Sequence, residues 1–127
     1  MYYIAKSQKT FAAATADLDG AVKRHQFGVL HVHDLGATLR SKGIDFKGEC
    51  KVFEVCSPKA AAQVLGIDMD MNMALPCRIS VWRQDGQTRI GMIEPEKMLA
   101  MLSSDPALAA VAREVGEATR RMIDDAR

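Results

Sequence analysis

The stretch Val55–Val81, VCSPKAAAQVLGIDMDMNMALPCRISV, contains the end of one strand, a helix and the start of another strand. Ser57 followed by Pro58 indicates a helix start, because a hydroxyl caps free backbone amides and proline suits the first helical position. Pro76 excludes a helix, and the residues Cys77–Arg83 that follow it are typical of a strand. We expect the methionine-rich segment between the helix and Pro76 to form a loop.

Upstream of this stretch, the hydrophobic pattern predicts three strands separated by two helices. Apolar residues recur at steps of three or four between Phe11 and His25, which gives a helix one buried stripe. Residues Phe27–His33 alternate between apolar and polar, as in a half-buried strand. The predicted elements are a strand Tyr2–Ser7, a helix Phe11–His25, a strand Phe27–His33, a short helix capped by Asp34 and ended by Gly43, and a strand Cys50–Cys56.

Downstream, the dipeptide Asp85–Gly86 predicts a tight turn that pairs Cys77–Arg83 with Thr88–Ile93 as an antiparallel hairpin. Two more helices are expected, one after Pro95 and one that begins at Asp105 and Pro106. The order strand, helix, strand, helix, strand, helix, strand, strand, helix, helix predicts an α+β fold in which helices pack on a mixed five-stranded sheet. Because 127 residues is the usual length of one compact domain, we expect a single domain over residues 1–127.

The composition is that of a globular protein. The chain has 127 residues, of which 48% are hydrophobic and 26% are charged, enough to bury one core. The 17 Lys and Arg residues nearly balance the 16 Asp and Glu residues, so a net charge of +1 predicts no nucleic-acid partner. No apolar run reaches the roughly 18 residues of a membrane span. With no signal-peptide pattern at the N-terminus, we expect a cytoplasmic protein without a membrane partner.

Cys56 and Cys77 are the strongest candidates for chemistry. Cys56 precedes the helix that Ser57 caps, and the positive end of the helix dipole favours a thiolate there. If the strands that carry Cys56 and Cys77 are neighbours, a reversible disulfide or a soft-metal site would follow. The alternative is that both cysteines are small apolar residues packed separately in the core.

Four further residues are candidates for binding. His31 and His33 lie on one face of a predicted strand, where both could meet one ligand, although such a face is more often simply solvated. Met71 lies among alternating methionines that suit a flexible flap over a pocket or a dimer contact. Trp82 shares a strand face with Arg78 and Ser80, opposite the aliphatic face, and this mixed face could bind a ligand or another subunit.

Several segments resemble a known family. FGVLHVHDL, EVCSPKAA and LPCRISVW followed by DG are similar, in this order and separation, to the family described as domain of unknown function 302, with Val55–Pro58 and Leu75–Cys77 as the most specific parts. The resemblance covers essentially the whole chain. It implies a small α+β domain that forms a homodimer. It gives no chemical role to the matching residues Cys56, Pro58, Pro76 and Cys77.

The sequence therefore supports two main hypotheses of different class, and a third is that the domain acts chiefly as an assembly partner. No phosphate loop, metalloprotease motif or nucleophile elbow is present, so hydrolase and nucleotide-binding functions lack support and the question of catalysis stays open. The first hypothesis is a homo-oligomeric domain that binds a small molecule or a protein in a cleft near the methionine-rich segment, without a metal or cofactor. The second is a thiol-dependent redox or soft-metal protein that uses Cys56 and Cys77.

Overall fold

The computed structural model describes all residues, 1–127, and contains five strands, five α-helices and one short 3₁₀-helix. The elements in chain order are β1 (Tyr2–Ser7), α1 (Phe11–Arg24), β2 (Gly28–Asp34), α2 (Leu35–Ser41), β3 (Cys50–Cys56), α3 (Pro58–Ile67), η1 (Met69–Ala74), β4 (Cys77–Gln84), β5 (Gln87–Ile93), α4 (Pro95–Leu102) and α5 (Pro106–Ala126). None of the helices combines the length and the apolar composition that crossing a bilayer requires.

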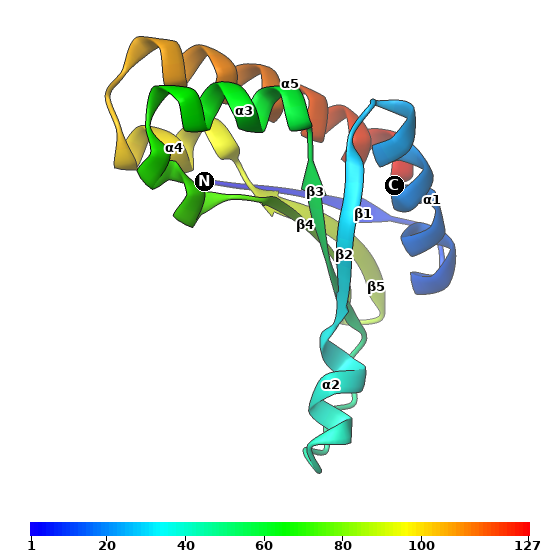
Figure 1. Ribbon diagram of the computed structural model, residues 1–127. Helices are drawn as coiled ribbons and strands as arrows, with labels where there is room; N and C mark the ends of the chain where they lie inside the picture. Colours follow the sequence, from blue (N-terminus) through cyan, green and yellow to red (C-terminus); the bar gives the residue numbers. More distant parts are fainter.

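The five strands form one sheet in the order β1-β5-β4-β3-β2. Every neighbouring pair is antiparallel. The α+β class and the element order are as predicted, but the expected mixture of parallel and antiparallel strands is not found. The reason is that α1 connects the two opposite edges of the sheet, whereas α2 projects beyond the ends of β2 and β3, so that β3 returns beside β2 in the opposite direction (Figure 1).

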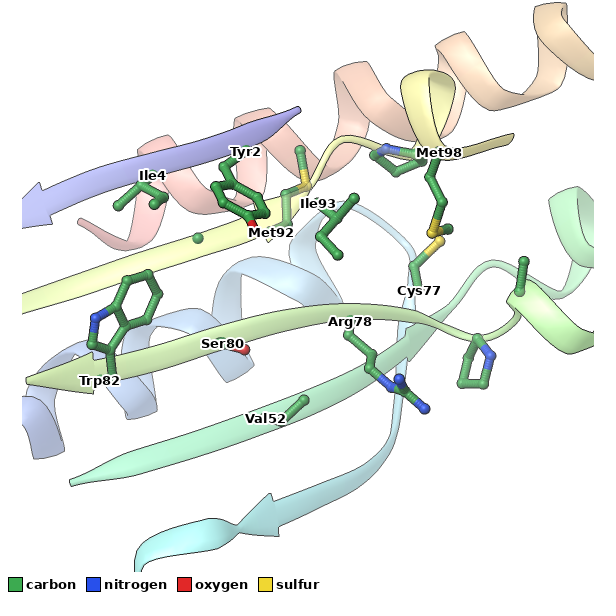
Figure 2. A pocket seen from close by; sticks show the side chains of 14 residues that line it. Tyr2, Ile4, Val52, Cys77, Arg78, Ser80, Trp82, Met92, Ile93 and Met98 are labelled. Atoms are coloured by element: carbon green, nitrogen blue, oxygen red, sulfur yellow. The ribbon is translucent and has the colours of Figure 1, made fainter. Parts of the chain in front are cut away.

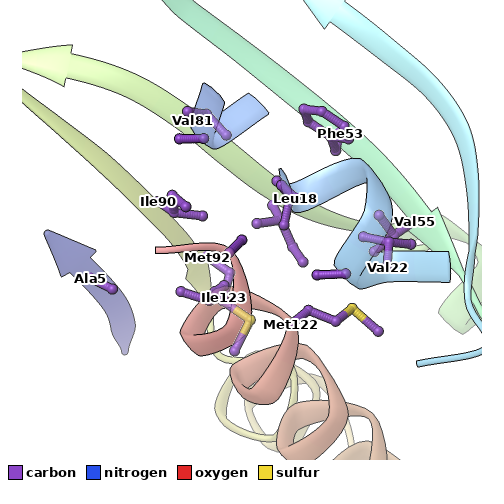
Figure 3. Close-up of a cluster of buried hydrophobic side chains, with 14 residues drawn as sticks. Ala5, Leu18, Val22, Phe53, Val55, Val81, Ile90, Met92, Met122 and Ile123 are labelled. Carbon is purple, nitrogen blue, oxygen red and sulfur yellow. The ribbon is translucent and has the colours of Figure 1, made fainter. Parts of the chain in front are cut away.

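Helices α1 and α5 cover one face of the sheet. The main core lies between these two helices and the sheet (Figure 3). Leu18 and Val22 of α1 and Ile123 of α5 are fully buried there. From the sheet they meet the inward side chains of the central strands, namely Phe53, Val55, Ile79, Val81 and Ile90. A smaller cluster joins α3, η1, α4 and α5 and contains Val64, Met71, Leu99, Leu108 and Ala112. No helix takes part in a core on the other face of the sheet.

The local signals for the ends of elements are confirmed. The Ser57 hydroxyl accepts a hydrogen bond from the amide of Ala60, and Pro58 begins α3. Asp85 and Gly86 both have positive φ, as a tight hairpin turn between right-twisted strands requires. Gly43 also has positive φ after α2. The methionine-rich segment differs from the expectation, because it forms the 3₁₀-helix η1 and is not an irregular loop.

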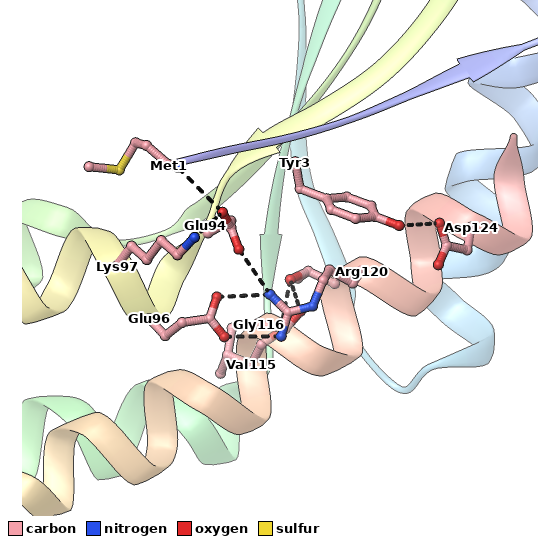
Figure 4. Close-up of polar contacts among 10 residues, drawn as sticks. Met1, Tyr3, Glu94, Glu96, Lys97, Val115, Gly116, Arg120 and Asp124 are labelled. Atoms are coloured by element: carbon pink, nitrogen blue, oxygen red, sulfur yellow. Dashed lines mark hydrogen bonds and ion pairs between the residues drawn. The ribbon is translucent and has the colours of Figure 1, made fainter.

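Helices α4 and α5 are joined by an ion-pair cluster (Figure 4). The Nη1 and Nη2 atoms of Arg120 donate hydrogen bonds to the two carboxylate oxygens of Glu96, at 2.9 and 3.1 Å. Arg120 also reaches Glu94 at 3.4 Å, and Glu94 in turn pairs with Lys97 and the N-terminal amine. Gly116 lies directly under this cluster, because a Cβ atom there would collide with the Glu96 carboxylate. The absence of a side chain at Gly116 therefore allows α4 to approach α5.

A pair of glycine substitutions tests this close approach. We expect Gly116→Ala to leave the protein about 1 kcal/mol less stable than Gly66→Ala, because the added methyl group displaces the Glu96 carboxylate from its pair with Arg120. Gly66 of α3 has open space around its Cα, so Gly66→Ala should raise the free energy of unfolding by up to about 1 kcal/mol. Urea unfolding of both variants measures the difference. Equal stabilisation by the two substitutions would contradict the proposed contact.

Candidate ligand-binding site

The uncovered face of the sheet is concave and holds a cavity of about 450 Å³ (Figure 2). Strands β1 and β5 form one side and strands β3 and β4 the other, and α4 closes one end with Met98. The side chains that line the cavity are mainly apolar; they include Tyr2, Ile4, Val52, Pro76, Trp82, Ile93 and Met98. A volume of this size is within the range of small-molecule sites.

Strand alternation explains which side chains reach this cavity. Ile79 and Val81 of β4 point into the core, so the residues between and beside them, Arg78, Ser80 and Trp82, point to the opposite face. The aliphatic and mixed faces predicted for this strand are thus found. Ser80 lies opposite Val52 on one side and Gly91 on the other, in the middle of the cavity floor.

The absence of a side chain at Gly91 leaves room in the floor of the cavity. A Cβ atom at this position would lie 3.0 Å from Ile4 Cγ1 and 3.1 Å from the Trp82 ring. Because Gly91 has no side chain, the indole ring packs close to the sheet, and its Nε1 donates a hydrogen bond to the Gln84 side chain at 3.2 Å. Trp82 therefore forms a fixed wall at one end of the cavity.

Three polar side chains in the cavity have no partner within the chain. Arg78, Ser80 and Tyr2 line it, and the structure gives none of them a side-chain hydrogen bond or salt bridge. An apolar hollow with a few free polar groups is the usual design of a small-molecule site, in which the polar groups orient the ligand.

A second cavity, of about 250 Å³, lies where β3 ends and β4 begins, under α3, η1, α4 and α5. It is almost entirely apolar, and its few polar contributors include Ser57 and Asn72. Both Cys56 and Cys77 line it. Cys77, Pro76 and Pro95 line both cavities and thus separate them.

The structure brings Cys56 and Cys77 to one place without linking them. Val55 is the direct cross-strand partner of Cys77, so Cys56 is one residue further along β3. All three cysteines of the chain are free thiols. Burial raises the pKa of Cys77 to about 11, and the charge that Cys56 carries as a thiolate adds to this effect. At neutral pH, Cys77 is therefore a protonated thiol and a poor nucleophile or metal ligand.

His31 and His33 lie on the same uncovered face, at the β2 edge. Their rings meet edge to face with centroids 4.4 Å apart, and His33 Nε2 lies 2.7 Å from Glu54 Oε1. The hydrogen bond from His33 lowers the pKa of Glu54, and the nearby positive charges, including that of Arg78, lower it further. Glu54 is therefore a carboxylate at neutral pH, already engaged by His33.

The remaining predicted residues are separated by the fold. Met71 is buried in the smaller core cluster and lines neither cavity. No group of three or more His, Cys, Asp or Glu side chains is arranged to hold a metal ion. The histidines and the two cysteines are therefore not brought together as one ligand set. Trp82 is the predicted residue that lies in the larger cavity without being shared with the smaller one.

Sequence reasoning missed the β1 and β5 side of the site. Tyr2 and Ile4 come from β1, and no local pattern indicates that this strand pairs with β5 beside Ile93. Their positions could have been assigned to a face by alternation, since Tyr3 and Ala5 turn toward the core. The sequence held no signal that β1 pairs with β5 and so reaches the same cavity.

These features define a small α+β domain with one covered and one concave, uncovered sheet face. The chain belongs to the family described as "Domain of unknown function DUF302", whose model matches residues 3–126. It is similar to the crystal structure of an uncharacterized conserved protein DUF302 from Bacillus stearothermophilus, with 30% sequence identity and a TM-score of 0.94 over 99% of this chain and 98% of the other. No curated protein matches the chain. The family resemblance seen in the sequence is confirmed.

The raised pKa of Cys77 predicts slow alkylation at neutral pH. A variant that keeps only Cys77 (Cys50→Ser with Cys56→Ser) should react with iodoacetamide roughly 100-fold more slowly at about pH 8 than a free thiol, because so little thiolate is present. Its rate should keep rising well above the ordinary thiol pKa, because burial, the main cause of the raised pKa, remains when Cys56 is replaced. A plateau of the rate near the ordinary thiol pKa of about 8.5 would contradict the assignment.

Proposed function

We propose that this protein is a binding domain for a small, largely apolar molecule, which occupies the larger cavity on the uncovered sheet face. The observation that carries the proposal is the hollow of about 450 Å³ that is lined by apolar side chains and by polar groups without partners. Contact between water and a concave apolar surface is unfavourable. A ligand that fills the cavity removes this contact and so recovers the free energy.

The cavity favours ligand binding over assembly alone. A domain whose only role was association would need a large apolar interface. It would have no need of a pocket. The uncovered face has exposed apolar side chains, with Tyr2 71% exposed and Ile93 48% exposed, but they surround a hollow. The homodimer implied by the family resemblance stays a prediction.

Trp82 provides a direct test, because it is the single tryptophan of the chain and lines the cavity. We expect octanoate or 1-octanol, two alkyl probes without ultraviolet absorption, to shift Trp82 fluorescence with saturation and to raise the melting temperature. Ser80→Leu should abolish both effects, because the larger side chain fills the middle of the floor.

A matched control separates filling of the cavity from general effects of an added leucine. Gln63 is exposed on α3 and lines neither cavity. Gln63→Leu should keep the fluorescence response and the thermal shift of the unsubstituted protein. The proposal is wrong if neither probe gives a saturable response, or if Ser80→Leu responds as strongly as Gln63→Leu.

A second candidate function is thiol chemistry, and one observation supports it: Cys56 and Cys77 line the same cavity. With hydrogen peroxide as the oxidant, the two thiols would form a disulfide, and the peroxide would be reduced to two molecules of water. The expected product is an intramolecular Cys56–Cys77 disulfide, which mass spectrometry of the non-reduced peptides detects. Oxidation that stops at separate sulfenic or sulfinic acids would exclude this function. The high pKa of Cys77 makes thiol chemistry the weaker of the two candidate functions.

A further inference from the structure

We infer that the ligand of the uncovered face is an amphipathic organic anion, whose acidic group binds Arg78 and whose apolar body lies between Trp82 and Met98. This inference rests on the proposed function, because it names the chemical class that the same cavity takes. Its support comes from the charges of the uncovered face, the free state of Arg78 and the position of Arg78 relative to the apolar wall.

The charges of the chain are distributed unevenly over the sheet. Trp82 lies on the uncovered face, so its cross-strand neighbour Arg89 and the next residue in that row, Lys6, share this face. With Arg78, the face carries three permanent cations. Glu54 is the one carboxylate that the strand register places there. The near-neutral net charge of the whole chain therefore hides a basic surface around the cavity.

The one nearby carboxylate, Glu54, feels the charge of Arg78 but forms no hydrogen bond or salt bridge with it. Glu54 is its cross-strand partner, but the Glu54 carboxylate is held by His33 at 2.7 Å. No hydrogen bond or salt bridge of Arg78 is present within the chain, and Arg78 lines the cavity. A guanidinium that is free beside an apolar hollow matches a carboxylate, with which it forms paired charge-assisted hydrogen bonds.

Arg89 shows the same shortage of acceptors at the Trp82 end of the face. Its Nε atom is buried and has no hydrogen-bond partner, which is uncommon in folded proteins. The uncovered face thus has an excess of donors with positive charge and a lack of acceptors. Arg89 does not line the cavity, but its positive charge on the same face favours an anionic ligand over a cationic one.

The arrangement in the cavity separates the acidic group from the apolar body. Figure 2 shows Trp82 at one end, Tyr2, Ile4 and Ile93 along one side, and the Arg78 guanidinium directed away from Trp82. A ligand with its acid at Arg78 therefore lays its apolar part along the wall that these side chains form. Ser80 offers one hydroxyl in the floor between them.

Two probes of nearly equal size test the inference. Octanoate and 1-octanol have the same eight-carbon chain and differ in the head group, a carboxylate or a neutral hydroxyl. We expect Trp82 fluorescence titrations to give a dissociation constant at least about tenfold lower for octanoate, as for other charge-assisted hydrogen bonds. The preference should shrink with added salt, because Arg78 is partly exposed to solvent.

Substitution of Arg78 assigns the preference to this side chain. Arg78→Gln should remove the preference for octanoate and leave the affinity for 1-octanol nearly unchanged, and Arg78→Lys should keep part of it. Arg113, exposed on α5 outside both cavities, gives the matched control. Arg113→Gln should keep the full tenfold preference while it changes the net charge by the same amount.

The outcomes separate this inference from the proposed function. If neither probe binds, the proposed function fails. If 1-octanol binds as tightly as octanoate and Ser80→Leu abolishes both, the cavity binds ligands but the inference of an anion is wrong. The inference also fails if Arg78→Gln and Arg113→Gln reduce the octanoate preference equally, since a general effect of net charge would then explain it.

Discussion

The structure depends on the burial of one sheet face against a single layer of two helices. Leu18 and Val22 from α1 and Met122 and Ile123 from α5 fill the space over the central strands and are removed from water almost completely. This hydrophobic contact is the largest in the molecule, and it uses one side chain in every two along each strand. Nothing comparable covers the alternate residues, so the same packing that makes the core also leaves the other face open.

The open face differs from the core in composition. The core side carries aliphatic side chains, whereas the open side carries an indole, a phenol, a hydroxyl and several cations. Gly91 adds to this contrast, because the absence of its side chain lets Trp82 and Ile4 pack close to the backbone of β5. Cys77 and Pro76 line both cavities. These residues therefore separate the open cavity on the basic face from the covered, apolar cavity.

Local chemistry predicted much of this fold, and long-range pairing accounts for most of the rest. The Ser57 cap, the Asp85–Gly86 turn and the alternation of β4 were readable because each depends on neighbours in sequence. The all-antiparallel sheet was not readable, since it follows from α2 projecting outward where a crossover helix was expected. Tyr2 and Ile4 line the site only because β1 pairs with β5. The alternating methionines suggested a flap or a dimer contact for Met71, and this was wrong because Met71 is buried in the smaller core cluster.

The projecting helix α2 has a consequence for how the chain can vary. It packs mainly on β3, far from the main core (Figure 1), and Gly43 after it has open space and positive φ. Segments of this kind open locally without unfolding the rest and tolerate added residues. The loop between α2 and β3 is therefore the place where a tag, a label or an extra binding segment can be inserted while the sheet and its cavity keep their shape.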